Sequence, residues 1–318
     1  MSVAAPAPAG FGHLLRHWRS VRAKSQLDLA CDAETTPRYV SFVETGRAQP
    51  SRQMVVRLAR ALDVPLRERN ELLLAAGYAP LYSSAPLSSP LLKRVEQALT
   101  SMLGQHEPFP AVVLDRGWQV LRANDGAQRL FSRLFAPHPV PAPANVLRLV
   151  IEPGPMRDQL RNWAAVVPAL LDRAHREAIS GVLDRDTAEL VRNLRSRPDV
   201  TRLLTEPDLS PGTTPIVDLH FDMAGTSLRF FSVVSSIGAP IDVTAQELRV
   251  EAFFPADDET RHGWTSFATT ERAPPRLTTP NRSTRDPPLG ARDGSSLDHR
   301  PGAPDQVDLC AMPSGSGR

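Results

Sequence analysis

The stretch SQLDLACDAETTPRYVSFVETGR, residues 25–47, decides the fold of the N-terminal part of the chain. It predicts two short helices, at residues 26–31 and 37–45, joined by a tight turn. Ser25 and Thr36 stand directly before these helices. Their hydroxyls can accept hydrogen bonds from the first backbone N–H groups, as helix N-caps do. The stretch therefore indicates a helix, a turn and a second helix.

The second of these helices is expected to present a polar and aromatic face outward. Pro37 suits its first position, where a missing N–H costs nothing, and Gly46 suits the residue after its end. Val40 and Val43 lie three positions apart and are expected in the core. The outward side chains are Arg38, Tyr39, Ser41 and Phe42. One arginine, a hydroxyl and two aromatic rings suit a DNA major groove better than plain water.

Three further amphipathic patterns surround this helix pair. They cover residues 11–23, 51–62 and 66–76. Ser51 is a further N-cap candidate, and Gly77 stops the last pattern. In the helix before the turn we expect Leu27 and Ala30 to face inward and Cys31 to be buried. Five short helices around one small core form a repressor-like bundle, which we place at residues 11–78.

The run FVETGRAQPSRQMVVRLARALDVPLRERNELLLAAGYAP narrows this interpretation to a family. The helix pair resembles the helix-turn-helix of the XRE (Cro/repressor-like) regulators. The continuation is similar to the members that carry a MmyB-like ligand-binding domain. The resemblance covers residues 11–261. It implies a cytoplasmic transcription regulator with a DNA-binding bundle and a PAS-like second domain that takes small apolar, fatty-acid-like ligands.

The helix-turn-helix supplies the expected DNA contacts. We expect them at Gln26, Thr36, Pro37, Arg38, Tyr39, Ser41, Phe42, Arg47 and Arg52. Arg38 can present its fork to guanine, while Arg47 and Arg52 suit phosphates. Glu34 occupies the turn position where such motifs often place glycine, so we expect a strained or altered turn. Glu44 has two possible roles: it pairs with an arginine of the first helix, or it is a solvated carboxylate.

Charge is unevenly distributed although the whole chain carries a net charge of only +2. Residues 1–85 hold 11 Lys/Arg against 7 Asp/Glu, so the basic surplus lies with the bundle that would meet phosphates. One small bundle buries too little surface to select a genomic site. We therefore expect a homodimer on a pseudo-palindromic operator in double-stranded DNA. The alternative is that the bundle docks protein instead of DNA.

Cysteine and hydropathy patterns favour a cytoplasmic protein. The chain has 2 cysteines, Cys31 and Cys310, and the second lies in a proline-rich tail, so a disulfide between them is not expected. No apolar run reaches membrane-spanning length, so we expect no membrane partner.

The second domain, placed at residues 91–264 after a linker at 79–90, is predicted to be of the α+β class. Expected helices cover residues 91–103, 124–135, 155–176 and 186–195, and residues 145–151 lead into the third of them. Expected strands cover residues 111–114, 118–123, 216–222, 227–235 and 247–254. This order favours a five-stranded antiparallel sheet with helices between the strands. Residues 269–318 are rich in proline and polar residues, and their composition predicts disorder.

A ligand cavity in this domain would be lined by apolar and aromatic residues. The resemblance places the candidates at Trp118, Phe131, Trp163, Leu170 and Phe230. Arg161 and Asn162, beside Trp163, are candidate donors to a carboxylate head group. Core packing is the alternative role for the aromatic residues. A second domain that binds no ligand, and serves dimerisation or protein docking, is the alternative function.

Catalytic and metal-binding patterns are weak. Asp218, His220 and Asp222 alternate along one predicted strand and share a side, which fits either a metal site or, as we expect, the solvated face. No nucleophile elbow, phosphate-binding glycine loop or cysteine pair is found. We therefore expect no enzyme, no metal and no cofactor beyond the fatty-acid-like ligand.

Overall fold

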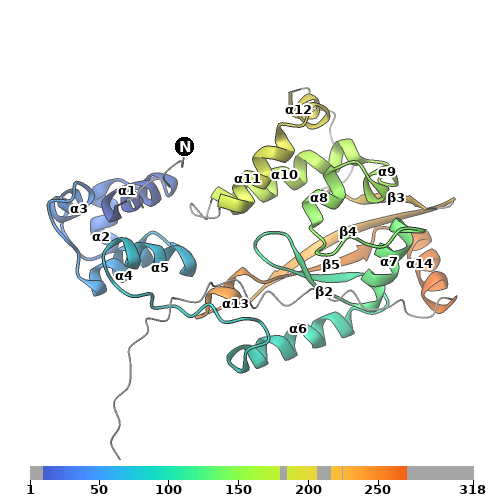
Figure 1. The fold of residues 1–318 in the computed structure, drawn as a ribbon, viewed down its shortest axis with the longest axis horizontal. Coiled ribbons are helices and arrows are strands. Elements are labelled where there is room, and N and C mark those ends of the chain that lie inside the picture. The colour runs from blue at the N-terminus through green and yellow to red at the C-terminus, as the bar shows by residue number, and fades with distance from the viewer. Residues whose placement is uncertain (1–9, 180–184, 206–215, 224, 271–318) are drawn as a thin grey trace, which may run out of the picture. The chain divides into compact units, whose positions relative to one another are not determined.

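The structure, a computed structural model, describes residues 10–179, 185–205, 216–223 and 225–270. Along these residues five helices come first, and a five-stranded antiparallel sheet with further helices follows (Figure 1). This order confirms the predicted α+β class. The predicted disordered tail begins at residue 269, and from residue 271 onward it lies outside the described residues.

The first part of the chain is a bundle of short helices. Their bounds are α1 (Phe11–Val21), α2 (Gln26–Asp32), α3 (Pro37–Glu44), α4 (Arg52–Ala61) and α5 (Leu66–Ala75). The three predicted N-caps are confirmed, because the hydroxyls of Ser25, Thr36 and Ser51 each accept a backbone N–H bond. Gly46 and Gly77 follow α3 and α5 with φ angles of 73° and 83°, a conformation that glycine adopts without strain.

Apolar side chains from all five helices fill the core of this bundle. One fully buried residue from each helix is Leu15, Leu29, Val40, Leu58 and Leu73. α1 approaches α3 closely at Gly12, where an added Cβ would lie 2.5 Å from the carbonyl oxygen of Glu44. The start of α1 and the end of α3 are therefore packed backbone against backbone.

The inward face of α2 differs from the prediction. Leu27 is 58% exposed, and Cys31, expected to be buried, is exposed as well. Ala30 is buried as expected, and Leu29 and Ala33 are buried with it. Two positions along a helix turn a side chain by roughly 200°, so a core stripe that includes Leu29 leaves Leu27 in solvent.

The sheet of the second domain has the predicted number of strands. They are β1 (Ala111–Leu114), β2 (Val120–Ala123), β3 (Leu219–Met223), β4 (Thr226–Ser236) and β5 (Arg249–Pro255). Their order is β2-β1-β5-β4-β3, and every neighbouring pair is antiparallel. The register pairs Val112 with Glu251 and Ser232 with Phe253. These pairs bring side chains from three strands onto one face.

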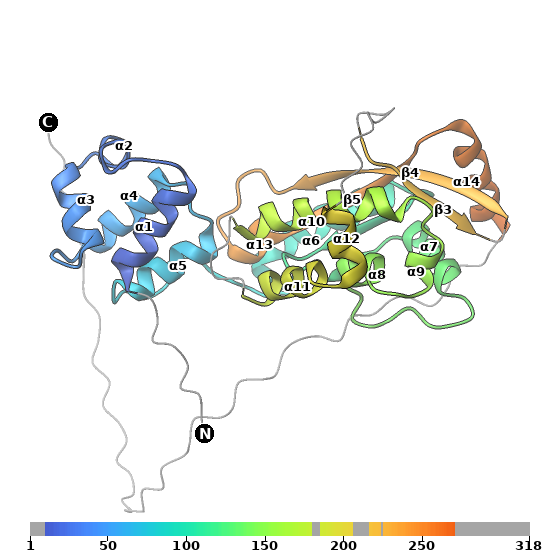
Figure 2. The same cartoon turned by 90° about the horizontal axis from the view of Figure 1, so that it is seen from above.

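Helices cover both faces of this sheet. η1 (Pro90–Leu92) leads into α6 (Lys93–Gln105), whose Leu99 and Leu103 pack against Val113 and Val250 on one face. The helices associated with the other face are α7 (Asp125–Phe135), α8 (Val146–Ile151), α9 (Pro155–Asp158), α10 (Trp163–Ile179), α11 (Arg185–Arg195) and α12 (Pro198–Thr205). Figures 1 and 2 show α6 and α10 on opposite sides of the sheet.

Two more helices complete the domain, and one predicted helix is divided. α13 (Val243–Glu247) precedes β5 and α14 (Asp258–Thr270) follows it. The helix expected at residues 155–176 is broken between α9 and α10. There Arg161 donates its backbone N–H to His220 at 2.8 Å, and Gln159 accepts one from Asp222 at 2.9 Å. Residues 159–161 are not part of a continuous helix because their backbone forms hydrogen bonds with β3.

Candidate functional site: a DNA-reading helix and an apolar cavity

α3 carries most of the residues predicted to read DNA. Its first turn is fixed by Thr36, whose hydroxyl accepts the N–H of Tyr39 at 3.2 Å. Arg38 is exposed, and its guanidinium carbon lies 5.2 Å from the centre of the Phe42 ring. Ser41 is half-buried beside them. The surface of α3 thus combines a guanidinium, a hydroxyl and an aromatic ring on a short capped helix.

Two of the predicted DNA contacts are partly engaged inside the protein. Tyr39 is half-buried against the bundle core, and burial, with a smaller effect of Tyr78, raises the pKa of its hydroxyl. Gln26 donates from Nε2 to Oε2 of Glu44 at 2.9 Å. Its amide nitrogen therefore links α2 to α3. The sequence pattern did not reveal this contact.

Glu44 is buried and pairs with an arginine of the first helix, which was the first of the two roles considered for it. Arg19 donates to it through Nε at 2.7 Å and through Nη2 at 3.1 Å. Burial by itself raises the pKa of the Glu44 carboxyl, but the bonds from Arg19 and Gln26 outweigh burial and lower it. The bonds from α1 and α2 converge on the C-terminal end of α3, so the orientation of α3 in the bundle is fixed.

The edges of the α3 surface are mostly basic. Pro37, Arg47 and Arg52 are exposed, so both arginines can reach phosphates. The turn before α3 contains Glu34 with φ at 49°, the strained conformation expected from a non-glycine residue there. Its carboxylate accepts a bond from Arg57 at 2.9 Å, which offsets the negative charge near the surface.

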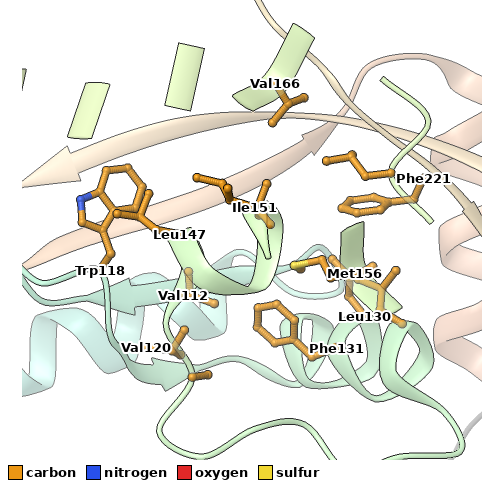
Figure 3. Packing of buried hydrophobic residues seen from close by; sticks show 14 of the residues in the cluster. Val112, Trp118, Val120, Leu130, Phe131, Leu147, Ile151, Met156, Val166 and Phe221 are labelled. Carbon is orange, nitrogen blue, oxygen red and sulfur yellow. The ribbon is translucent and has the colours of Figure 1, made fainter. Parts of the chain in front are cut away.

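An apolar cavity of about 170 Å³ lies in the second domain. Its lining comes from the sheet, from α7, α8, α9 and α10, and from the loops beside them. Apolar residues of the lining include Val112, Leu130, Phe131, Met156, Val166, Leu170 and Phe221. Figure 3 shows several of them converging from different elements. The cavity resembles in size an engineered cavity of about 150 Å³ that stays dry and binds benzene.

Some predicted ligand residues line this cavity and others pack elsewhere. Phe131 and Leu170 belong to the lining. Trp163 does not, because its indole N–H is bonded to a backbone oxygen of α8 at 2.9 Å. Phe230 is buried in an edge-to-face contact with Trp264, with ring centres 5.6 Å apart. Trp163 and Phe230 therefore have the alternative role named above, which is packing in the core.

Arg161 and Asn162, the predicted head-group donors, also lie outside the lining. Asn162 donates from Nδ2 to the Asp218 backbone oxygen at 2.7 Å and accepts the backbone N–H of His220 at 3.1 Å. The Arg161 side chain is 61% exposed and lies 3.7 Å from Asp222. The expectation that these residues bind a head group in this cavity is therefore corrected. Both side chains contact β3 or the residues directly before it, at the start of α10.

Trp118 supports a pair of arginines instead of lining the cavity. It is fully buried with φ at 64°. The guanidinium carbons of Arg173 and Arg249 lie 4.6 Å and 4.9 Å from its ring centre. Burial, followed by the charge of Arg173, lowers the pKa of Arg249 to about 10. Trp118 thus stabilises two cations in a buried setting.

The polar end of the cavity was missed by the sequence analysis. Arg173, Ser232 and Glu251 are the polar residues of the lining among the described residues. Arg173 donates from Nη1 to Oε1 of Glu251 at 3.3 Å and from Nε to Glu177 at 3.1 Å. A signal was present in the sequence, since strand alternation places Glu251 on the same face as Phe253. A carboxylate on a face with apolar neighbours indicates a buried polar group.

Two of the three residues considered for a metal site are bonded to other side chains. His220 Nε2 lies 2.7 Å from the Ser227 hydroxyl, and Asp218 accepts a bond from Arg229 at 3.2 Å. Asp222 is exposed. Within the described parts of the chain, no group of three His, Cys, Asp or Glu residues has the arrangement of a metal site.

Two family models match the chain. One describes a helix-turn-helix domain and matches residues 11–72. The other describes the MmyB-like transcription regulator ligand binding domain and matches residues 95–263, more than half of the chain. The chain belongs to the MmyB-like transcription regulators. No curated protein matches it.

In this MmyB-like regulator each candidate site falls within a matched region. α3 belongs to the helix-turn-helix domain, and every residue that lines the cavity belongs to the ligand-binding domain. The protein is accordingly a DNA-binding transcription regulator. Among the described helices, none combines the length and apolar character that crossing a membrane requires.

Proposed function

We propose that this regulator binds its operator as a homodimer through α3, and that a small apolar, fatty-acid-like ligand in the cavity alters that binding. The observation that carries the proposal is the exposed Arg38 on a helix whose two ends are fixed. Thr36 caps its start, and the pair of Arg19 with Glu44 holds its end. The guanidinium of an exposed arginine on a firmly held helix can present two parallel donors to guanine.

The proposed homodimer is inferred from the small size and modest positive charge of a single helical bundle. A single bundle carries few exposed cations beside α3, chiefly Arg38, Arg47 and Arg52. Specific affinity in a genome requires a larger contact area, which two copies on a two-fold symmetric site provide.

The regulatory step follows from the cavity. A ligand shifts an equilibrium only by its difference in affinity for two arrangements of the protein. The lining joins α7, α8, α9 and α10 to the sheet, so a ligand inside it contacts five different elements. An arrangement that closes these elements on the ligand is therefore favoured when the ligand is present.

In vitro selection of duplex DNA by the full chain tests the reading function. The proposal predicts enrichment of a sequence with two half-sites whose centres lie about one helical turn, 10–10.5 base pairs, or a multiple of it apart. A pool that stays random after repeated selection would contradict it.

Native mass spectrometry of the purified full chain tests the ligand function. We expect a dimer that carries added mass from a small organic molecule, and we expect organic extraction to remove that mass. A second domain that serves only dimerisation or docking gives the dimer without any added mass, and that result would overturn the sensor part of the proposal.

A further inference from the structure

Ser232 of β4 presents a hydroxyl to the cavity without a hydrogen-bond partner. It pairs with Phe253 of β5, and both residues belong to the lining, so the Ser232 side chain lies on the cavity face of the sheet. Ser232 is half-buried, and its hydroxyl forms no hydrogen bond within the described part of the chain. The hydroxyl oxygen is not one of the atoms that are buried without a partner, so a ligand can reach it.

The other two polar residues of the described lining offer less to a ligand. Arg173 donates from Nη1 to Oε1 of Glu251 at 3.3 Å, so these two side chains are engaged with each other. Their other terminal atoms, Arg173 Nη2 and Glu251 Oε2, have almost no accessible surface and are out of reach of a ligand in the cavity. Ser232 is therefore the polar side chain that is best placed to bond to a ligand.

The lining changes from buried to exposed residues across the cavity. Phe131 and Met156 are buried, and Figure 3 shows them converging from α7 and α9. Ala169 of α10 and Val217, which precedes β3, line the same cavity but are exposed. The cavity therefore has a closed apolar part and an opening beside α10 and the start of β3.

Ser232 lies at this opening. The antiparallel register pairs Leu219 of β3 with Phe230 of β4, and two residues further along it brings Val217 beside Ser232. Val234, the next residue of β4 on the same face, is 41% exposed. The hydroxyl thus lies where the lining meets solvent, and the apolar side chains lie behind it.

We propose that a fatty-acid-like ligand enters the cavity tail first, and that its carboxylate stays at the opening and accepts a hydrogen bond from the Ser232 hydroxyl. At the opening the carboxylate keeps part of its hydration, which it would lose among the buried apolar side chains. Of the two charged residues in the lining, Arg173 is the more accessible, with 22% of its side chain exposed against 9% for Glu251, which favours an anion. This inference rests on the proposed ligand function and specifies the orientation of the ligand and the residue that binds its head group.

Carbon-13 NMR of octanoate bound to the full chain at about pH 7.5, where octanoate is ionised, tests the orientation. One sample carries the label at the carboxyl carbon and the other at the methyl carbon, with protein in excess. A neutral gadolinium chelate, which stays in the water, is then added. The carboxyl signal should lose more intensity than the methyl signal. Equal losses, or a greater loss at the methyl carbon, would overturn the orientation and leave the ligand function standing. Absence of saturable octanoate binding in isothermal titration would overturn both.

Substitution of the hydroxyl gives an independent test. Ser232→Ala should weaken octanoate binding by about tenfold, as expected for the loss of a hydrogen bond to a charged group. Its affinity for 1-aminoanthracene, which has no carboxylate, should stay the same. Ser235→Ala, an exposed serine of the same strand outside the lining, is the matched control and should change neither affinity. Unchanged octanoate affinity in folded Ser232→Ala would overturn the head-group assignment. Equal weakening of both ligands would also overturn it, because that result indicates an altered cavity and not a lost bond.

Discussion

Arg19 of α1 and Glu44 of α3 form a two-bond pair, with donor–acceptor distances of 2.7 Å and 3.1 Å. The Glu44 side chain is 1% exposed, so this pair lies in the bundle and not on its surface. Gln26 of α2 donates to the same carboxylate. One carboxylate therefore ties three helices together directly behind the face that is proposed to read DNA.

Removing this carboxylate should destabilise the bundle. Glu44→Ala leaves the Arg19 guanidinium without its partner in a largely buried site, which costs about 3 kcal/mol in the free energy of unfolding. Glu34→Gln is the control, because its pair with Arg57 is exposed and contributes less than about 1 kcal/mol. Urea denaturation followed by circular dichroism measures both. Equal effects of the two substitutions would refute the assignment.

The same carboxylate should make stability depend on acidity. The pKa of Glu44 is lowered in the folded protein, where burial is outweighed by the bonds from Arg19 and Gln26. The unfolded chain therefore binds a proton more readily. This contribution to stability is complete above the ordinary carboxyl pKa and is lost as the pH falls through the lowered folded-state value. Urea midpoints on that acidic limb should fall less steeply for Glu44→Gln than for the wild type, and parallel limbs would count against this prediction.

Gly12 should not tolerate a methyl group. An added Cβ would lie 2.5 Å and 2.7 Å from the carbonyl oxygens of Glu44 and Val43, so α1 and α3 would have to separate. Gly12→Ala is expected to cost about 1–3 kcal/mol. Gly104→Ala, in α6 with no atom within 4 Å of the added carbon, should instead stabilise by up to about 1 kcal/mol. Thermal unfolding that shifts in the same direction for both variants would show that the close approach is absent.

Local signals in the sequence were sufficient for most elements of the fold. The caps at Ser25, Thr36 and Ser51 could be predicted because they depend on neighbours within three residues. The five strands could be predicted from alternation and turn residues, within a few residues at their ends. The sequence analysis did not predict α12, α13 or α14, of which α12 and α13 are short, with 8 and 5 residues.

Long-range contacts explain what the sequence did not reveal. The break before α10 depends on bonds to β3, some sixty residues later in the chain. The role of Gln26 depends on Glu44, which lies 18 positions away. The polar end of the cavity depends on the proximity of Arg173 and Glu251, which only the packing of α10 on the sheet creates.

Blocking the cavity should abolish ligand binding without harming the fold. Ala169 lines the cavity yet is exposed, so Ala169→Trp places a large ring at its opening. Ala164→Trp is the matched control, an exposed alanine of the same helix outside the lining. Fluorescence titration with 1-aminoanthracene, a neutral apolar probe, should show at least about tenfold weaker binding for Ala169→Trp alone. Equal binding by both variants would place the ligand elsewhere.

Contacts to phosphates and to bases should respond differently to substitution. Arg52 is exposed at the first position of α4 and is expected to bind a phosphate. Arg52→Ala should weaken binding to selected and scrambled duplexes alike and reduce the salt slope of the affinity by about 1. Loss of affinity for the selected duplex alone would instead make Arg52 a base contact.

The most direct test of DNA reading by α3 is the affinity ratio between the selected duplex and a scrambled one, measured by fluorescence anisotropy for the wild type and Arg38→Ala. Arg38 is predicted to contribute about 1–3 kcal/mol of discrimination, so its removal should lower the ratio by about tenfold or more, while the circular dichroism spectrum stays the same. A ratio that is unchanged in a folded Arg38→Ala protein would contradict the proposed reading face.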